Sequence, residues 1–274
     1  MIPSTRKRWN GQAADGGDVS VETTAYPDDE SLAEGACSLA LARINDGLRA
    51  RGRAVIVLAG GNTPRETYRL LARAITEQKV PAHRLAWLFG DERWVPVQDP
   101  QSNERMAREC LLDPIGAPAS TVISWDAGRG EPVDCAARYA LKAGEAMAGD
   151  LADLVFLGMG ADGHTASLFP DGTVHLSDGK SVAVGPDIHG YAVAVSSATA
   201  GGWRLTLCPG TLSASRTVMF LVSGNEKAAA LRRAREGDHA TPAAWIRGNT
   251  TLFLVTRGAL GPEAADFGRD IRHA

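Results

Sequence analysis

The sequence predicts an α/β fold, with a mostly parallel, doubly wound (Rossmann-like) sheet and helices on both faces. Short, continuous apolar runs at residues 53–58 and 85–89 are typical of strands that are covered on both faces, as in parallel sheets. Apolar strands alternate three times with helical patterns before Asp153, which indicates βαβ units. Residues 191–195 and 204–207 predict a small antiparallel edge portion in the C-terminal half.

Length and composition fit a single such domain. The chain has 274 residues, 44% hydrophobic and 22% charged, with a net charge of -3, which is ordinary for a globular protein with a sizeable core. We expect a mobile N-terminal tail over residues 1–18 and one α/β domain over residues 19–274. Because there is no basic run, we expect no nucleic-acid partner, and an anionic ligand would need a local cluster of Arg and Lys.

The cysteines and the apolar runs predict the compartment. The four cysteines are far apart and form no paired, zinc-type spacing, so we expect them to be reduced. No apolar run approaches the roughly 18 to 20 residues that span a bilayer, and the N-terminus lacks the apolar core of a secretory signal. We therefore expect a cytoplasmic protein without a membrane partner, metal or cofactor, as a monomer or weak homodimer.

Two elements open the predicted domain. Residues 19–23 alternate and are β-branched, which predicts a strand near an edge of the sheet. From Leu32 onward an apolar residue recurs at every fourth position, which predicts a helix that runs to about Arg51 and ends at Gly52.

The loop after the strand at 53–58 is rich in backbone donors. It reads Gly60-Gly61-Asn62-Thr63 and leads into a predicted helix with Pro64 at its first position, where Glu66 would complete a capping box with Thr63. A glycine turn before a helix N-terminus is a ready anion site, because free amides point at the ligand. The same glycines would also suit a tight turn without any ligand.

Three charged residues follow the strand at 85–89. Asp91, Glu92 and Arg93 are costly at the end of a buried strand unless they pair with each other or face a cleft, and the sequence leaves both options open. A helix over residues 104–112 follows. A short strand at 121–124 and a helix over 133–148 then lead to the apolar run at 153–157.

The loop after residues 153–157 carries the strongest chemical signal. Its glycines have the dinucleotide spacing G-x-G-x-x-G over 158–163, but Pro170 and the Asp-Gly pair behind it leave no room for the helix that such a site needs. Of the six histidines, only His164 lies in a glycine-rich turn after a strand. A neutral imidazole, with a usual pKa of about 6.5, can accept a proton from water, and Asp162 would orient it.

The rest of the chain adds one more junction. We expect a long loop over residues 172–188, the two alternating strands, a short helix at 211–215 and a buried strand at 217–222. Asn225 would cap the next helix and place Lys227 in its first turn, where a cation opposes the helix dipole and is better used on a ligand. A last strand at 251–255 and a tail from Arg257 close the chain.

Four junctions therefore follow one pattern, with an apolar strand, small residues and then a helix start. They lie at Gly60, Gly90, Gly158 and Gly224. In a doubly wound sheet the carboxyl ends of parallel strands form a single crevice, where such folds bind ligands. The side chains that these junctions would bring to it are Thr63, Asp91, Arg93, Asp162, His164 and Lys227.

The motifs at these junctions resemble those of 6-phosphogluconolactonase, in the superfamily that also holds glucosamine-6-phosphate isomerase. The resemblance covers about residues 19–230, and its most specific part is Gly163-His164-Thr165-Ala166-Ser167-Leu168-Phe169-Pro170. It implies hydrolysis of 6-phosphogluconolactone in the oxidative pentose phosphate route, without a metal. His164 would be the general base that activates water.

The resemblance also implies where the sugar-phosphate substrate, the only expected partner, would bind. Backbone donors at Gly160 and Gly163 would stabilise the oxyanion. The groups implied for the substrate and its phosphate are the residues of the first loop and four charged side chains, namely Gly60, Gly61, Asn62, Thr63, Asp91, Arg93, Arg204 and Lys227.

Two other functions stay open. Glucosamine-6-phosphate deaminases share the Gly-Gly-x-Thr-Pro loop, but they typically continue after Gly-His with an Ile-Ala-Phe run that ends in Glu, whereas this chain has Thr-Ala-Ser-Leu-Phe at 165–169. A non-catalytic sugar-phosphate binding protein would keep the same pocket. The chain also departs from the lactonase pattern at Leu252–Thr256, which lacks a Trp and an Asp, and at Asn62, where many members have Ser.

Overall fold

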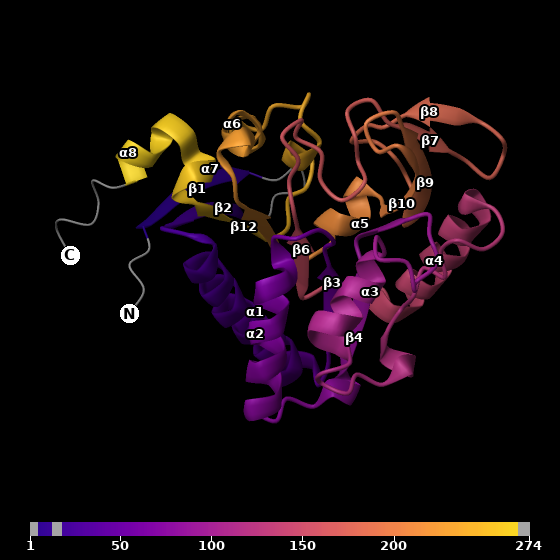
Figure 1. Cartoon of the computed structure of the whole chain (residues 1–274), viewed down its shortest axis with the longest axis horizontal. Helices are drawn as coiled ribbons and strands as arrows, with labels where there is room; N and C mark the ends of the chain where they lie inside the picture. Colours follow the sequence, from indigo (N-terminus) through magenta and orange to yellow (C-terminus); the bar gives the residue numbers. More distant parts are fainter. Residues whose placement is uncertain (1–4, 13–17, 268–274) are drawn as a thin grey trace.

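The computed structural model describes residues 5–12 and 18–267. A sheet of seven strands forms its centre, and its place in the molecule can be followed in Figure 1. The strand order is β1-β2-β12-β11-β6-β3-β4. From β2 to β4 all neighbours run parallel, whereas β1 pairs antiparallel with β2. The strands are β1 Thr5–Gln12, β2 Asp18–Tyr26, β12 Thr250–Thr256, β11 Thr217–Val222, β6 Leu154–Leu157, β3 Ala54–Leu58 and β4 Leu85–Phe89.

A second, five-stranded sheet is antiparallel throughout. Its order is β5-β10-β9-β7-β8. The expected small antiparallel portion is therefore confirmed, but it is a separate sheet, and it includes β5 from the N-terminal half. Its strands are β5 Asp91–Arg93, β10 Gly202–Leu207, β9 Ala192–Ser197, β7 Thr173–His175 and β8 Ser181–Ala183.

Helices cover both faces of the main sheet, as predicted. The helices α1 and α2 pack against each other below the sheet in Figure 1, and α6 and α7 lie above it. The α-helices of the described residues are α1 Asp29–Arg51, α2 Pro64–Glu77, α3 Asn103–Ala107, α4 Pro132–Met147, α5 Pro209–Ser213, α6 Ala228–Glu236, α7 Arg257–Leu260 and α8 Ala264–Phe267. No described helix has the length and apolar character that a membrane span needs.

The core explains why the central strands read as continuous apolar runs. Every residue of β3 and of β11 is buried, because helices cover both faces of these strands. Each large apolar side chain that is fully buried stabilises the fold by about 1.5 to 3 kcal/mol. A smaller apolar cluster lies under the second sheet and includes Val174, Val193 and Val195.

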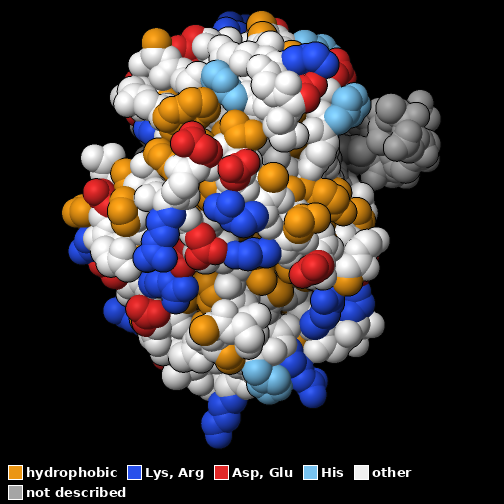
Figure 2. All heavy atoms as spheres, turned by 90° about the vertical axis from the view of Figure 1, so that its right-hand side faces the viewer, with side chains coloured by type: hydrophobic (Ala, Val, Ile, Leu, Met, Phe, Trp, Pro, Cys, Tyr) orange, Lys and Arg blue, Asp and Glu red, His pale blue; other side chains and the backbone are white. Residues whose placement is uncertain are grey.

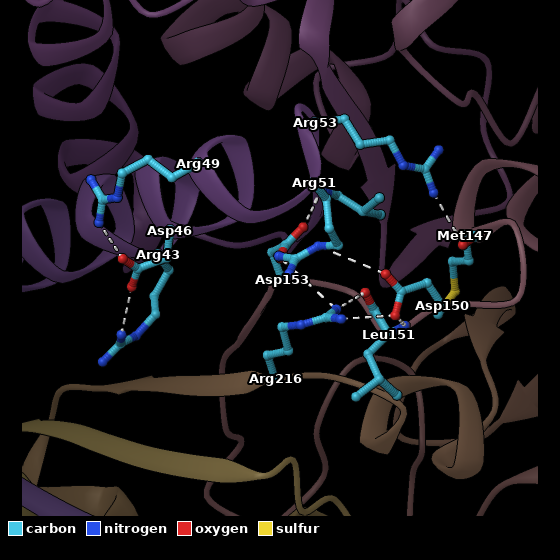
Figure 3. Close-up of polar contacts among 11 residues, drawn as sticks. Arg43, Asp46, Arg49, Arg51, Arg53, Met147, Asp150, Leu151, Asp153 and Arg216 are labelled. Carbon is cyan, nitrogen blue, oxygen red and sulfur yellow. Dashed lines mark hydrogen bonds and ion pairs between the residues drawn. The ribbon is translucent and has the colours of Figure 1, made fainter.

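A buried carboxylate ties the amino ends of the central strands together (Figure 3). Asp153, which precedes β6 and is 3% exposed, accepts a hydrogen bond from the Val55 amide at 2.8 Å and forms ion pairs with Arg51 and Arg216. Arg216 also binds Asp150 at 2.8 Å. This cluster lies at the amino ends of the strands and therefore at the opposite end from the predicted crevice.

The N-terminal segment differs from the expected tail. Residues 5–12 form β1, which pairs along its whole length with β2, while residues 1–4 and 13–17 lie outside the described residues. The strand at 19–23, expected near an edge, lies within β2 and is next to the edge strand β1. The physical reason is that a bare edge exposes a row of unpaired backbone groups, which an added antiparallel strand satisfies.

Three other expectations are wrong. Residues 121–124 do not form a strand, since only Val122 bridges to β4, through Trp87, after a 3-10 turn at Ala119–Thr121. The expected loop at 172–188 contains the β7–β8 hairpin, and the tail from Arg257 contains α7 and α8. In each case the element is three or four residues long and gives too little periodicity to recognise from sequence.

The helix expected over residues 104–112 is α-helical in its first part and π-helical in its second part. It consists of α3 followed by a π-helical turn, η2 Arg108–Leu112. Such π turns are rare and occur often near functional sites. Here the turn follows the C-terminus of α3, and at the N-terminus of the same helix the Asn103 side chain contributes to the pocket described next.

On the face that Figure 2 draws, positive and negative side chains are mixed. Figure 2 shows the face at the right-hand side of Figure 1, where Lys and Arg side chains gather near the middle with Asp and Glu side chains among them. A surface of this kind does not focus a single strong potential over a wide area. Binding of an anion therefore depends on local geometry.

Candidate active site

A pocket of about 190 Å³ lies at the carboxyl ends of the parallel strands. All four junctions predicted from the sequence contribute to it, at the ends of β3, β4 and β6 and at η4 Asn225–Lys227, which follows β11. The pocket is lined by residues 59–64, Gly90, Asp91, Arg93, Asn103, residues 157–159, His164, Ala166 and Lys227.

His164 and Asp162 form a pair at the mouth of the β6 loop. The Asp162 Oδ1 atom lies 2.6 Å from His164 Nδ1 and also accepts the His164 amide at 3.1 Å. The carboxylate thereby favours the tautomer with hydrogen on Nδ1, so that Nε2 keeps a lone pair for a proton. His164 lies against Phe169, with 4.5 Å between the ring centroids, and about a third of its side chain is exposed.

Gly160 makes room for this pair. A Cβ atom on Gly160 would lie 2.2 Å from His164 Nδ1 and 2.5 Å from Asp162 Oδ1, so these side chains would have to move. The glycine spacing that imitates a dinucleotide fingerprint therefore serves the histidine. As predicted, the described structure has no helix directly after this loop.

The amides of Gly160 and Gly163, which we expected to bind the oxyanion, are both hydrogen-bonded within their own loop. The Gly160 amide donates to the His164 carbonyl at 2.9 Å, and the Gly163 amide donates to the Gly160 carbonyl at 3.0 Å. Both groups therefore hold the loop together in this conformation and are already used. Ala166 lines the pocket beside His164, has a positive φ of 48°, and its amide donates to no residue that the structure describes.

Asp91 lies on the floor of the pocket and joins three segments. It is 8% exposed, accepts from Asn103 Nδ2 at 3.1 Å with one oxygen and from Ser167 Oγ at 2.7 Å with the other. Asn103 Nδ2 also donates to the Asp91 carbonyl at 3.0 Å. The start of α3 and the His164 loop are thus fixed to the same carboxylate.

Glu92 points the other way. Because side chains alternate along a strand, Asp91 and Arg93 face the pocket and Glu92 faces the N-terminus of α3. Glu92 accepts the amides of Asn103 at 2.7 Å and Glu104 at 2.9 Å, the Arg93 amide at 2.8 Å and the Ser102 hydroxyl at 3.0 Å. Burial raises the pKa of Glu92 to about 7, against the lowering effect of these donors.

The cations approach the pocket from two sides. Arg93 and Lys227 line it, and no described residue accepts a hydrogen bond from the Lys227 ammonium. Arg204 is paired with Arg93 across the β5–β10 ladder but does not line the pocket, and its guanidinium donates to the carbonyls of Ala200 and Trp203. Burial and the neighbouring Arg93 charge lower the pKa of Arg204.

The loop between β3 and α2 presents its backbone to the pocket. Within the described part of the chain, the amides of Gly60, Gly61, Asn62 and Thr63 donate to no protein acceptor. The predicted capping box is wrong, because Thr63 is already helical, at φ -55° and ψ -42°, and makes no side-chain cap. Pro64 does occupy the first helical position, so the free donors at this helix start are backbone groups.

The last junction also departs from the sequence prediction. Asn225 begins the 3-10 turn η4 and does not cap α6, whose N-cap is Lys227. Lys227 still lies at the helix start, as expected. The pocket also contains residues that the sequence prediction did not assign to the site, among them Asn103, Met159 and Ala166, while Ser167 lies directly behind it. Only the position of Asn103 at a helix start could have indicated its part.

The fold and the pocket define a doubly wound α/β protein with a histidine and free backbone donors at the carboxyl ends of its strands. The sequence profile of the family described as glucosamine-6-phosphate isomerases/6-phosphogluconolactonase matches residues 27–254. The chain belongs to this family, as its motifs indicate.

Several relatives carry the name 6-phosphogluconolactonase. The protein of that name from Synechocystis is 34% identical over 234 residues, which cover 84% of this chain and 89% of the relative. The one from Homo sapiens is 36% identical over 209 residues, covering 73% and 76%. The crystal structure of 6-phosphogluconolactonase from Thermotoga maritima superposes with a TM-score of 0.72, at 27% identity, over 85% of this chain and 98% of that chain.

Proposed function

We propose that the protein hydrolyses 6-phospho-D-glucono-1,5-lactone to 6-phospho-D-gluconate in the oxidative pentose phosphate pathway. The family and the names of its relatives support this substrate. The observation that carries the proposal is the His164–Asp162 pair, 2.6 Å apart, in a pocket with a loop of free amides and two cations.

In the mechanism that we propose, His164 is the general base. Its Nε2 takes a proton from a water molecule while the water oxygen attacks the lactone carbonyl carbon, and Asp162 stabilises the imidazolium that forms. The ring oxygen then leaves as the carbonyl re-forms, and the proton returns from His164 to that oxygen. The step needs no group from outside the chain.

The phosphate would lie among the amides of Gly60, Gly61, Asn62 and Thr63, with Arg93 and Lys227 supplying charge. A dianion at a helix start with charge-assisted hydrogen bonds is a strongly bound group. Arg204 would act beside Arg93, since two like charges opposite each other in a ladder cost stability until an anion lies between them. We place the oxyanion at the Ala166 amide, because those of Gly160 and Gly163 are in use.

We also propose that the protein works in the cytoplasm as a monomer or weak homodimer. The four free cysteines, all of them buried, fit a reducing compartment. Gel filtration with light scattering would measure the oligomeric state.

His164→Ala tests the function. We expect turnover of the lactone, measured above spontaneous hydrolysis, to fall by about 10² to 10⁴-fold, because a positioned base contributes that much. His83→Ala, which changes an exposed histidine in the 3-10 turn Ala82–Arg84, is the control and should keep full activity.

Three results would contradict the proposal. Lactone hydrolysis by the wild-type protein that is no faster than the spontaneous reaction would favour a non-catalytic sugar-phosphate binding protein, and unchanged turnover in His164→Ala would show that His164 is not the base. Release of ammonia from glucosamine 6-phosphate by the wild-type protein, without lactone hydrolysis, would favour the deaminase. In the last case Asp91, which lines the same pocket, would be the group that moves a proton.

A further inference from the structure

We infer that Ser167 and Asn103 are positioning residues that aim the Asp91 carboxylate at the hydroxyl groups of the sugar. Asp91 would then recognise the polyol part of the ligand, and the amide loop with its cations would recognise only the phosphate. The inference rests on the proposed function and names what each half of the same pocket binds.

The two partners of Asp91 leave part of its carboxylate free. An ionised carboxylate has about four acceptor positions. Asn103 Nδ2 and Ser167 Oγ fill one on each oxygen, at 3.1 and 2.7 Å. The remaining lone pairs of a side chain that lines the pocket can accept only from donors, and in a sugar phosphate those donors are hydroxyl groups.

Charge assigns the two halves of the pocket. Asp91 repels a phosphate dianion, so it cannot contact that end of the ligand. Arg93 lies two residues along the same strand and faces the same pocket, where it attracts the dianion. The acid and the cation on one strand therefore bind opposite ends of a ligand that carries both hydroxyls and phosphate.

The functional group of Asn103 is its side-chain nitrogen, Nδ2. Its Nδ2 binds two oxygens of Asp91, while its Oδ1 is buried and has no hydrogen-bond partner among the described residues. A buried acceptor without a partner, such as this Oδ1, lowers stability. The role of the Asn103 side chain is therefore better explained by what its Nδ2 binds than by a contribution to stability. Its Oδ1 also lies against Gly60, where a Cβ atom would be only 1.9 Å away.

Ser167 supplies the second anchor from the His164 loop. It is 1% exposed, and its hydroxyl donates to Asp91 at 2.7 Å. The neighbouring Thr165 hydroxyl holds the same loop by donating to the Gly158 carbonyl at 2.8 Å. Removal of the Ser167 hydroxyl should therefore release Asp91 without releasing the loop.

The experiment compares two probes on the full-length protein by calorimetric titration. The product, 6-phosphogluconate, contacts both halves of the pocket, whereas inorganic phosphate contacts only the amide loop and its cations. In Ser167→Ala and in Asp91→Asn we expect the affinity for 6-phosphogluconate to fall about tenfold or more, as loss of a charge-assisted hydrogen bond implies. The affinity for phosphate should be unchanged in Ser167→Ala and should not fall in Asp91→Asn, which removes a charge that repels the dianion.

Ser215→Ala is the matched control, because Ser215 is also fully buried but donates to the Leu212 carbonyl, away from the pocket. It should leave both affinities unchanged. Thermal unfolding of every variant verifies that the protein is folded, and Asn103→Leu, similar in volume, repeats the test from the second anchor.

The outcomes separate this inference from the proposed function. If the wild-type protein hydrolyses the lactone but Ser167→Ala and Asp91→Asn change both affinities equally, or neither, the inference is wrong and the function stands. A wild-type protein that neither hydrolyses the lactone nor binds 6-phosphogluconate overturns both. A selective loss of affinity for 6-phosphogluconate supports the division of the pocket.

Discussion

At the scale of single residues, neighbours in the sequence have different roles, one structural and the others at the pocket. The charged run Asp91-Glu92-Arg93 left two interpretations open, a structural one and a functional one, and the structure contains both. Glu92 binds the N-terminus of α3, whereas Asp91 and Arg93 line the pocket. The alternation of side chains along a strand was sufficient to separate them, but only once β5 was known to be a strand.

Glu92 should make stability depend on pH. Burial raises its pKa in the folded protein from 4.5 to about 7. The folded state therefore holds a proton that the unfolded chain loses, so this stabilisation is complete below about pH 4.5 and is lost as the pH rises through 7. Relative to Glu92→Gln, which cannot titrate, the free energy of unfolding should fall by up to about 3 kcal/mol across this window.

Urea unfolding of both proteins at several pH values measures this difference. A wild-type protein that gains stability over Glu92→Gln as the pH rises would contradict the prediction. It would show that the four hydrogen-bond donors around Glu92 outweigh its burial.

At the scale of elements, the sequence predicted the buried strands and the junctions well. Strands such as β3 and β11 are apolar throughout because both faces are covered, and that signal is local. The β7–β8 hairpin was not predicted. All three residues of β8 are exposed, so the strand has no apolar pattern and is defined only by its pairing with β7. The capping box at Thr63 failed because backbone angles decide capping, and residue type does not reveal them.

The loop after β6 depends on the missing side chain of Gly160. In Gly160→Ala the new methyl would overlap His164 Nδ1 and Asp162 Oδ1, so the two side chains must separate. We expect kcat for lactone hydrolysis to fall by at least about tenfold, because the base loses its orientation. Gly210→Ala, where nothing lies within 4 Å of the added atom, is the control and should keep its activity. Full activity in Gly160→Ala would show that Asp162 is not needed to orient His164.

At the scale of the whole molecule, the site depends on contacts between distant segments. Ser167 meets Asp91 across 76 residues of sequence, and no local pattern gives that contact. In contrast, the meeting of the four junctions could be predicted, because the carboxyl ends of parallel strands always lie at the same edge of a sheet. Sequence reasoning could therefore place the pocket and its histidine, whereas the contacts within the pocket required the structure.

The opposite end of the sheet should dominate stability. In Figure 3, Asp153 is buried between Arg51 and Arg216, whereas Asp46 pairs with Arg43 and Arg49 on an exposed face of α1. Asp153→Ala removes one ion-pair partner from each arginine, which keep Asp150, and leaves the buried Val55 amide without an acceptor. It should cost about 1 to 3 kcal/mol of unfolding free energy, as an unsatisfied buried donor does. Asp46→Ala, the matched exposed variant, should change it by less than about 1 kcal/mol. Equal effects in chemical unfolding would show that the buried cluster contributes little.

The strand order also has a consequence for how the protein is made. β2 has β12 as its parallel neighbour, so that Ser20 and Thr250, 230 positions apart, lie side by side and share a hydrogen bond. During synthesis the β1–β2 hairpin leaves the ribosome early, but its place in the sheet exists only after β12 has emerged. Contacts of such long range fold slowly and leave strand edges exposed meanwhile. The newly made chain must therefore wait, with one edge of its central sheet unfilled, until β12 at Thr250–Thr256 has been translated.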